Sequence, residues 1–443
     1  MKRQLSVNLD NLLLSLSEVL DLANPALSQH QQRTAFIALE IARQANLPAE
    51  IIENIFAAAL LHDIGAITVE EKIAIHNFEV MDINIHTIRG QILLEQIPWL
   101  TKLSKIVRNH HRSWSNWDEG IDNQLVLSSQ IILLADYVER LVDRNVYILY
   151  QTQVITEKIE KLADNVLHRK VIAYFLEVSQ REEFWLDLAS PRLYSLLLNN
   201  GPFSDVIIGI DDVLLLSNMF RDLIDFKSRF TATHTTGVSE CAVMLEELFG
   251  LAEYDVKLMR IAGNFHDIGK LLIPNSILEK PDKLTAAEYQ VMKCHTYYTY
   301  YTLNSIGGLQ RIAEWAAYHH EKLYGSGYPF HCTNEEIGTG SRIMAVADIF
   351  TAISEDRPYR KGMNQDEIYR ILQKQSDNNL LDKRIVALLF DNYEVISLKV
   401  KEKQAEAYDF YEKRFITIDE KLTYEEHLQL CTSMEKLPGQ QLP

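Results

Sequence analysis

The sequence His62-Asp63-Ile64-Gly65 occurs again 204 positions later as His266-Asp267-Ile268-Gly269. Each tetrapeptide carries the second member of an ordered series of five histidines that is followed by an aspartate. In both series the first histidine lies 32 residues before the second, and the third lies 24 residues before the fourth. This duplication predicts two metal-binding units in tandem.

The candidate ligands are the five histidines of each series, the tetrapeptide aspartate and the closing aspartate. In the first copy they are His30, His62, Asp63, His86, His110, His111 and Asp136. In the second copy they are His234, His266, Asp267, His295, His319, His320 and Asp348. A lone histidine is more often structural, but the duplicated spacing favours ligation for these ten. The histidines without a counterpart, to which no role is assigned, are His76, His168, His331 and His427.

Composition limits the class of protein. The 443 residues are enough for two domains, each with its own core, and 47% of them are hydrophobic. A net charge of -17 opposes binding to duplex nucleic acid, which depends on neutralising phosphates. No apolar run is long enough to cross a bilayer, and the start lacks a signal-peptide core, so a cytoplasmic protein without membrane attachment is expected.

Apolar residues recur at helical spacing in nearly every segment, as in Ile51 to Leu61 and Leu125 to Val142. We therefore expect an all-α fold built from two tandem helical domains. The turn-forming sequence Asn199-Asn200-Gly201-Pro202 places the boundary near residue 205. The expected divisions are residues 1–205, residues 206–400 and a charged helical tail at 401–443.

The ligand types indicate the chemistry. Five histidines and two aspartates offer more donors than one tetrahedral ion needs, so two divalent ions are predicted in each intact site, bridged by Asp267 in the second copy. Nitrogen and oxygen donors without thiolate favour iron or manganese, and zinc or nickel less distinctively. Two such ions can hold a bridging hydroxide that attacks a phosphodiester. Lys270 is positioned to neutralise charge on the phosphate.

Residues 266–270, His-Asp-Ile-Gly-Lys, resemble the HD superfamily of metal phosphohydrolases, and residues 319–329, His-His-Glu-Lys-Leu-Tyr-Gly-Ser-Gly-Tyr-Pro, resemble its HD-GYP subfamily. The resemblance covers about residues 208 to 400. It implies an all-helical cyclic di-GMP phosphodiesterase whose metal ligands are those of the second series. It also implies that Asp267 and Lys270 are catalytic. The substrate contacts that it implies, besides Lys270, are Arg357, Arg360 and Tyr328.

Two positions depart from the family pattern. Tyr324 stands where the family usually has aspartate before its Gly-x-Gly, which is expected to tune the loop without abolishing chemistry. Phe230 stands where members thought to bind a third metal carry glutamate, which favours a two-metal site.

The first copy resembles the same family and has a complete ligand set, but it lacks three features of the second. Ala66 replaces the lysine, Arg112 replaces the glutamate after the paired histidines, and Ser113 to Gly120 contains no Gly-Tyr-Pro loop. The first domain is either a second catalytic centre or a metal-bound regulatory domain. The missing lysine favours regulation.

The leading prediction is a metal-dependent phosphodiesterase that opens cyclic di-GMP to the linear dinucleotide, with further cleavage left open. An HD domain followed by an HD-GYP domain also resembles enzymes acting on 3′,3′-cyclic GMP-AMP, which is the alternative substrate. A catalytically weak signalling scaffold is the alternative from another class. In it, the loop at 324–329 would bind a partner such as a cyclic di-GMP synthase. The native metal and the oligomeric state stay open.

Overall fold

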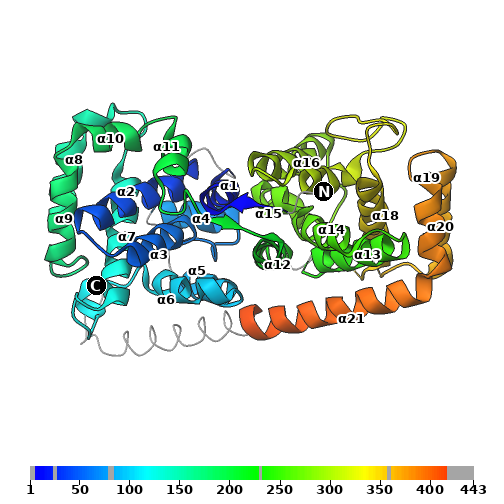
Figure 1. Ribbon diagram of the computed structural model, residues 1–443, viewed down its shortest axis with the longest axis horizontal. Coiled ribbons are helices and arrows are strands. Elements are labelled where there is room, and N and C mark those ends of the chain that lie inside the picture. Colours follow the sequence, from blue (N-terminus) through cyan, green and yellow to red (C-terminus); the bar gives the residue numbers. More distant parts are fainter. Residues whose placement is uncertain (1–4, 23–26, 78–83, 229–231, 357–360, 417–443) are drawn as a thin grey trace, which may run out of the picture.

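The computed structural model describes residues 5–22, 27–77, 84–228, 232–356 and 361–416. Within these ranges the chain is almost wholly helical, with two strands of two residues each. The prediction of an all-α protein is therefore confirmed. None of the helices in the described ranges is both long and apolar enough to span a bilayer. Figure 1 shows two helical halves side by side.

The first half contains β1 (Val7–Asn8), α1 (Leu9–Asp21), α2 (His30–Gln44), α3 (Ala49–Leu60), α4 (Val69–His76), α5 (Asn84–Glu95), η2 (Pro98–Leu100), α6 (Thr101–Asn109), η3 (Trp114–Asn116), α7 (Gln124–Leu141), η4 (Ile148–Tyr150), α8 (Thr152–Glu160), α9 (Arg169–Ser179), α10 (Glu182–Leu188) and α11 (Leu193–Asn200). The second half contains β2 (Ile207–Ile208), α12 (Ile210–Phe226), α13 (His234–Leu248), α14 (Glu253–Phe265), η5 (Ile268–Leu272), α15 (Asn275–Leu278), α16 (Ala286–Ser305), α17 (Gln310–Ala317), η6 (Tyr318–His320), α18 (Thr339–Ser354), α19 (Gln365–Asp377), α20 (Lys383–Asp391), α21 (Tyr393–Tyr411) and a π-helical end, η7 (Glu412–Ile416). The segment between α11 and β2 contains the boundary that the sequence predicts near residue 205.

The sequence repeat is a repeat of helices in the same order. The first histidine of each copy begins α2 or α13, and the second follows α3 or α14. The third lies on α5 or α16, and the paired histidines follow α6 or α17. The closing aspartate lies on α7 or α18. Each ligand is therefore carried by a helix or a helix end, which gives the two sites the same framework.

In each half, an aspartate of the first helix accepts a hydrogen bond from the first turn of the second helix. Asp21 of α1 accepts a hydrogen bond from the Gln31 amide at 2.8 Å, and Asp225 of α12 accepts one from the Thr235 amide at 2.8 Å. A carboxylate stabilises a helix start because the first amides there have no partner within the helix. Burial raises the pKa of Asp21 to about 7 and that of Asp225 to about 6. These contacts fix the helix end at which the first histidine lies.

The tetrapeptide glycine allows two backbones to approach each other closely. A Cβ atom at Gly65 would lie 2.0 Å from the carbonyl oxygen of His86, and one at Gly269 would lie 2.0 Å from the carbonyl oxygen of His295. No side chain fits at such distances from backbone atoms. Glycine is therefore required for the third histidine to reach the tetrapeptide aspartate.

The two halves interlock through their leading elements. Strands β1 and β2 pair antiparallel, with Val7 opposite Ile208. Helix α1 contacts α16 and η5 of the second half, while α12 contacts α5 of the first. Asn11 of α1 donates a hydrogen bond to the Ser305 carbonyl at 3.1 Å. The buried apolar residues of both halves form one cluster.

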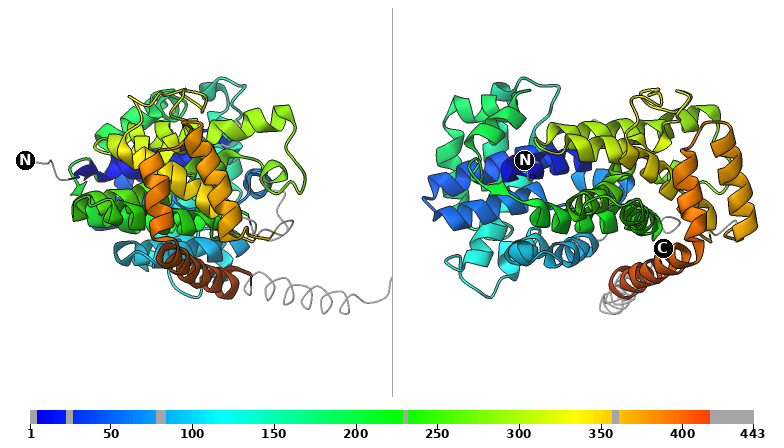
Figure 2. Two further views of the ribbon diagram at one scale, coloured as in Figure 1. Left: turned by 90° about the vertical axis from the view of Figure 1, so that its right-hand side faces the viewer. Right: turned by 45° about the vertical axis from the view of Figure 1, so that its right-hand side comes forward.

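Helix α21 packs along α13, and Figure 2 shows it on the outside of the second half. Its end is held by aromatic contacts, since the ring of Phe226 lies 4.8 Å from that of Tyr411 and 4.4 Å from that of Phe415. Position 401, where the sequence places the start of the tail, lies inside this helix, and the preceding Val400 is buried. The described part of the tail is therefore the continuation of a helix that packs on the second half.

Glu246 of α13 is a fully buried carboxylate whose two oxygens have no hydrogen-bond partner among the described residues. Burial, assisted by Asp255, raises the pKa of Glu246 from 4.5 to about 7. Because the folded protein then holds this proton more tightly than the unfolded chain, the free energy of unfolding falls as pH rises from about 4.5 to about 7.

We expect Glu246→Gln to raise the free energy of unfolding by about 1–2 kcal/mol at pH 8, with little change at pH 4. Urea unfolding at both pH values measures the difference. Glu247→Gln, which changes the exposed neighbour, is the matched control. An equal gain at both pH values would contradict the pH dependence.

Candidate metal centres

Asp267 lies at the centre of the second histidine series and is buried. Its Oδ1 is 3.4 Å from Nε2 of His295 and 3.9 Å from Nε2 of His319. Its Oδ2 is 3.1 Å from Nε2 of His266 and 4.0 Å from Nε2 of His234. The two oxygens therefore face two different pairs of imidazoles, which is the arrangement needed to bridge two ions.

The closing aspartate contacts both sides of this cluster. Asp348 Oδ1 is 3.2 Å from Nε2 of His234, and its Oδ2 is 3.8 Å from Nδ1 of His320. His320 lies against His295, with 5.2 Å between the ring centroids. The structure thus brings together all seven ligands predicted in the second copy.

The first copy repeats this arrangement around Asp63. Its Oδ1 is 3.4 Å from Nε2 of His86 and 3.6 Å from Nε2 of His110. Its Oδ2 is 3.5 Å from Nε2 of His30 and 3.4 Å from Nε2 of His62. Asp63 therefore also faces two pairs of imidazoles, one with each oxygen.

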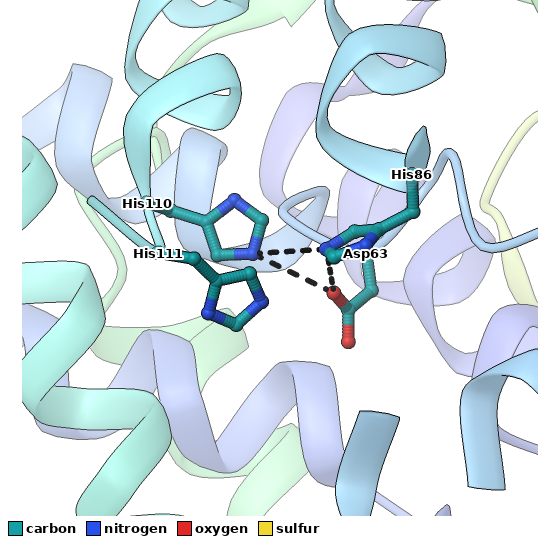
Figure 3. A group of neighbouring side chains, drawn as sticks. All are labelled: Asp63, His86, His110 and His111. Carbon is teal, nitrogen blue, oxygen red and sulfur yellow. Dashed lines mark hydrogen bonds and ion pairs between the residues drawn. The ribbon is translucent and has the colours of Figure 1, made fainter. Parts of the chain in front are cut away.

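The remaining predicted ligands of the first copy lie at its edges. Figure 3 shows His111 beside His110, next to the contacts that join His86, His110 and Asp63. These four residues form a group whose ligand atoms lie within 4.8 Å of one another. Asp136 Oδ1 lies 3.6 Å from Nε2 of the first histidine of the copy. All seven predicted ligands are therefore gathered in the first copy as well.

The histidine orientation is set by backbone carbonyls. In five histidines the Nδ1 atom lies 2.6–2.8 Å from the carbonyl oxygen three residues earlier. They are His62, His110, His266, His295 and His319. A hydrogen on Nδ1 satisfies that carbonyl and leaves the Nε2 lone pair directed at the aspartate.

Charge states in both clusters suit metal binding. Burial lowers the pKa of His86 and His319 to about 3 and that of His295 to about 4. Burial alone would raise the pKa of Asp63 and Asp267, but the surrounding imidazoles outweigh it and hold both values well below the ordinary range. The first histidine of each copy differs, because a carboxylate outweighs burial there: Glu139 raises the pKa of His30 well above its ordinary value, and Glu355 raises that of His234 to about 9. An ion that binds these two imidazoles would displace a proton, since neutral imidazoles and ionised carboxylates are the forms that bind divalent ions.

Unpartnered ligand atoms support the same conclusion. In the second copy, His266 Nε2 and Asp267 Oδ1 are buried without a hydrogen-bond partner among the described residues. In the first copy, the same is true of Asp63 Oδ1 and His111 Nε2. Buried polar atoms are normally paired, and a metal ion would satisfy these. The residues present therefore fit divalent ions in both halves.

The two centres differ in their cations. In the second copy the Lys270 ammonium lies 2.5 Å from Asp267 Oδ2, and its side chain keeps 19% exposure. The first copy has Ala66 at the matching position. A cation of the first copy that does contact a predicted ligand is Arg140, whose Nη1 is 2.8 Å from Asp136 Oδ2. Arg140 also donates to the carbonyls of Ile75 and His76, so this guanidinium is already engaged.

The loop after the paired histidines of the second copy is held by Glu321. Its carboxylate accepts backbone hydrogen bonds from Phe330 at 2.7 Å and from the next two amides at 3.1 Å. Tyr328 then lies at the cluster, with its ring 4.9 Å from that of His320 and 5.4 Å from the Lys293 ammonium. In the first copy, Arg112 at the matching position instead bonds to a nearby carbonyl.

Four residues named from the sequence lie outside the described residues. They are Phe230, Arg357, Arg360 and His427.

Sequence reasoning missed the carboxylates that hold the first histidine of each copy. Glu139 Oε2 lies 2.6 Å from His30 Nδ1, and Glu355 Oε2 lies 3.2 Å from His234 Nδ1. Glu139 follows the closing aspartate by three residues on the same helix, so helical spacing could have indicated it. His76, to which no role was assigned, lies 3.9 Å from Glu139.

Comparison with known proteins gives the family. Residues 27–141 and residues 218–385 each match a family model described as HD domain. A Vibrio cholerae protein described as 3′3′-cGAMP-specific phosphodiesterase 1 is 28% identical over 398 residues, which cover 87% of this chain and 92% of that protein. A cyclic di-GMP phosphodiesterase of Thermotoga maritima is 34% identical over 194 residues, which cover 43% of this chain and 52% of that protein.

A crystal structure of a cyclic GMP-AMP-specific phosphodiesterase of V. cholerae aligns with a TM-score of 0.62 and 21% identity, over 88% of this chain and 98% of that one. This likeness concerns the fold. The chain belongs to the HD family and carries two HD domains, as the sequence predicts.

Proposed function

We propose that the second half hydrolyses a phosphodiester bond of a cyclic dinucleotide, using two divalent ions held on either side of Asp267. The observation that carries this proposal is that the two oxygens of Asp267 face two separate imidazole pairs, with Lys270 beside them. Iron and manganese are the proposed ions, since the donors are nitrogen and oxygen. When bound, the ions would polarise the phosphoryl group and activate water.

The residues of the chain have separate tasks in this proposal. The imidazoles and carboxylates hold the ions, and the carbonyl contacts at Nδ1 fix the direction of each lone pair. Lys270 neutralises charge that develops on the phosphoryl oxygens as the ester bond breaks. The Tyr328 ring, half-buried next to His320, offers a face on which a guanine can stack. Arg357 and Arg360 stay proposed contacts for guanine or phosphate.

Two substrates are candidates. The sequence motifs favour cyclic di-GMP, and several relatives are phosphodiesterases of that nucleotide. The V. cholerae protein that aligns over both halves is described as specific for 3′3′-cGAMP, which supports that nucleotide as the second candidate. The two differ in one base, so the choice rests on the recognition loops and not on the ligands.

We propose that the first half is a metal-bound regulatory domain. It has a complete ligand set, which supports ion binding, but it has Ala66 in place of Lys270. Arg140 cannot readily take the place of this lysine in contacting a phosphate, because three of its nitrogen donors already bond to Asp136 and to two backbone carbonyls. The Arg140 side chain is also only 5% exposed, against 19% for Lys270, so it is less able to reach a phosphate in its site.

The proposed divisions are residues 1–205, residues 206–400 and a tail at 401–443 that begins within α21 and packs on the second half. The proposed location is the cytoplasm. A signalling protein such as a cyclic di-GMP synthase is the proposed protein partner. The loop at Tyr324 supports this, because that side chain is 80% exposed.

The direct test is product formation from cyclic di-GMP and from 3′,3′-cyclic GMP-AMP by protein reconstituted anaerobically with iron or manganese. We expect metal-dependent formation of a linear dinucleotide, lost in His266→Ala. Rates with the two nucleotides rank the substrates. Absence of cleavage with either nucleotide under both metals would overturn the proposal in favour of a signalling scaffold.

A further inference from the structure

The first histidine is held differently in the two halves. In the first half, Glu139 bonds to His30 Nδ1 with one oxygen, and its other oxygen lies 2.9 Å from Arg144 and 3.9 Å from Arg33. All of these residues belong to α2, α7 or the turn that follows α7. The support of the first histidine is therefore complete within its own domain.

The second half lacks these partners. The position matching Glu139 is Thr351, and the position matching Arg33 is Gly237. Glu355, directly after α18, bonds to His234 Nδ1 instead, with a side chain that is 10% exposed. The two arginines that contact Glu139 in the first half have no counterparts at the matching positions of the second half. No arginine at those positions is available to bond to the second oxygen of Glu355.

Gln404 of α21 supplies the missing contact. Its amide nitrogen donates a hydrogen bond to Oε1 of Glu355 and lies 3.4 Å from the carbonyl oxygen of Thr233. Gly237 leaves the space for it, since a Cβ atom there would lie 2.5 Å from the Gln404 amide nitrogen and 2.7 Å from Cγ2 of Thr351. A glycine on α13 and a glutamine on α21 therefore fit each other beside the metal centre.

We propose that Gln404 is a positioning residue of the second metal centre, which α21 supplies through the opening at Gly237. This inference rests on the metal centre of the proposed function. Gln404 holds one oxygen of Glu355, which leaves the other to accept the Nδ1 hydrogen of His234. The Nε2 atom of His234 then stays directed at Asp348, 3.2 Å away. Partners that orient a ligand in this way typically change metal affinity 10- to 100-fold when removed.

The test measures Mn²⁺ affinity in the full chain by titration, in a background of His62→Ala with Asp63→Ala that disables the first centre. We expect Gln404→Met to weaken one of the Mn²⁺-binding steps of the second centre by about tenfold or more. Gln153→Met is the matched control, because Gln153 donates to Glu157 at 2.9 Å on the exposed face of α8. Unchanged affinity in Gln404→Met would overturn the inference.

A second pair of variants separates this contact from a loss of folding. Gly237→Ala is expected to displace the Gln404 amide and weaken Mn²⁺ binding in the same direction. In Gly237→Ala with Gln404→Ala the combined loss is expected to be smaller than the sum of the two single losses, because both variants remove the Gln404–Glu355 contact and only Gly237→Ala also crowds Thr351. Additive losses would contradict the proposal. Gln404→Asn, one methylene too short to reach Glu355, tests the same point if Gln404→Met does not fold.

A readout without metal addresses the orientation directly. In metal-free protein with ¹⁵N-labelled histidine, the spectra are recorded above pH 9, because Glu355 and Asp348 outweigh burial and raise the pKa of His234 to about 9. There the neutral His234 is expected to carry its hydrogen on Nδ1 in the parent and to show mixed tautomers in Gln404→Met. An identical tautomer in both proteins would count against the role of Gln404. Neither measurement uses a nucleotide. A parent that binds metal and cleaves nothing would therefore reject the proposed function and leave this inference standing.

Discussion

Asp267→Asn is expected to lower cyclic dinucleotide hydrolysis by about a thousandfold or more, equivalent to about 4 kcal/mol in the activation barrier. Asparagine replaces one carboxylate oxygen by an amide group that donates hydrogen bonds and cannot bind a cation. Because the two oxygens of Asp267 face different imidazole pairs, the change would remove a ligand from one of the two proposed ions and the bridge between them. Turnover and metal content measured on the same samples test this.

The first half offers the matched comparison. Asp63→Asn makes the same change in a centre with nearly the same geometry. If hydrolysis belongs to the second half, this variant should lose metal from the first centre and retain more activity than Asp267→Asn. The reverse ranking would move the catalytic role to the first half. Equal losses in both would show that turnover requires both centres.

Lys270→Ala is expected to reduce turnover by about a hundredfold while both ions stay bound, a loss typical of removing one group that stabilises charge in the transition state. The Lys270 ammonium is 2.5 Å from Asp267 but remains partly exposed, so it can reach a phosphate above the centre. The loss is expected in kcat more than in KM, since the charge develops as the ester bond breaks. Steady-state kinetics and metal analysis together measure it.

Lys257→Ala is the control for this change, because Lys257 pairs with Asp211 at 2.9 Å on the surface. It should leave turnover near that of the parent. Loss of metal from Lys270→Ala would contradict a direct role, because it would mean that the lysine acts by stabilising Asp267. Full activity in Lys270→Ala would remove this residue from the mechanism.

Much of both centres could be predicted because helices carry the ligands at fixed spacings. The spacing of 32 residues from His30 to His62 is repeated from His234 to His266. In both copies this stretch forms two corresponding helices, α2 and α3 in the first and α13 and α14 in the second. The all-helical fold followed from apolar periodicity. Ligation by these residues stays a prediction, but their gathering around one aspartate in each half is what the spacing led us to expect.

The contacts that support the ligands could not be predicted in the same way. Glu139 and Glu355 each bond to the first histidine of their own copy. They follow the closing aspartate by different numbers of residues, so the sequence repeat does not align them. Gln404 belongs to a segment that the sequence assigns to a charged tail, and no local pattern links it to Gly237. The interlocking of α1 and α12 likewise depends on contacts between residues far apart in the chain.

The contacts between the leading elements have a consequence for how the two halves could come to differ. Strands β1 and β2 pair antiparallel, and α1 and α12 each contact the opposite half, which resembles the relation of two subunits in a symmetric dimer. In a dimer of identical chains, a substitution in one subunit necessarily appears in both. Fusion into one polypeptide removes that constraint and keeps the partners at high effective concentration. One member of the pair can therefore retain lysine while the other carries alanine, without loss of the interface.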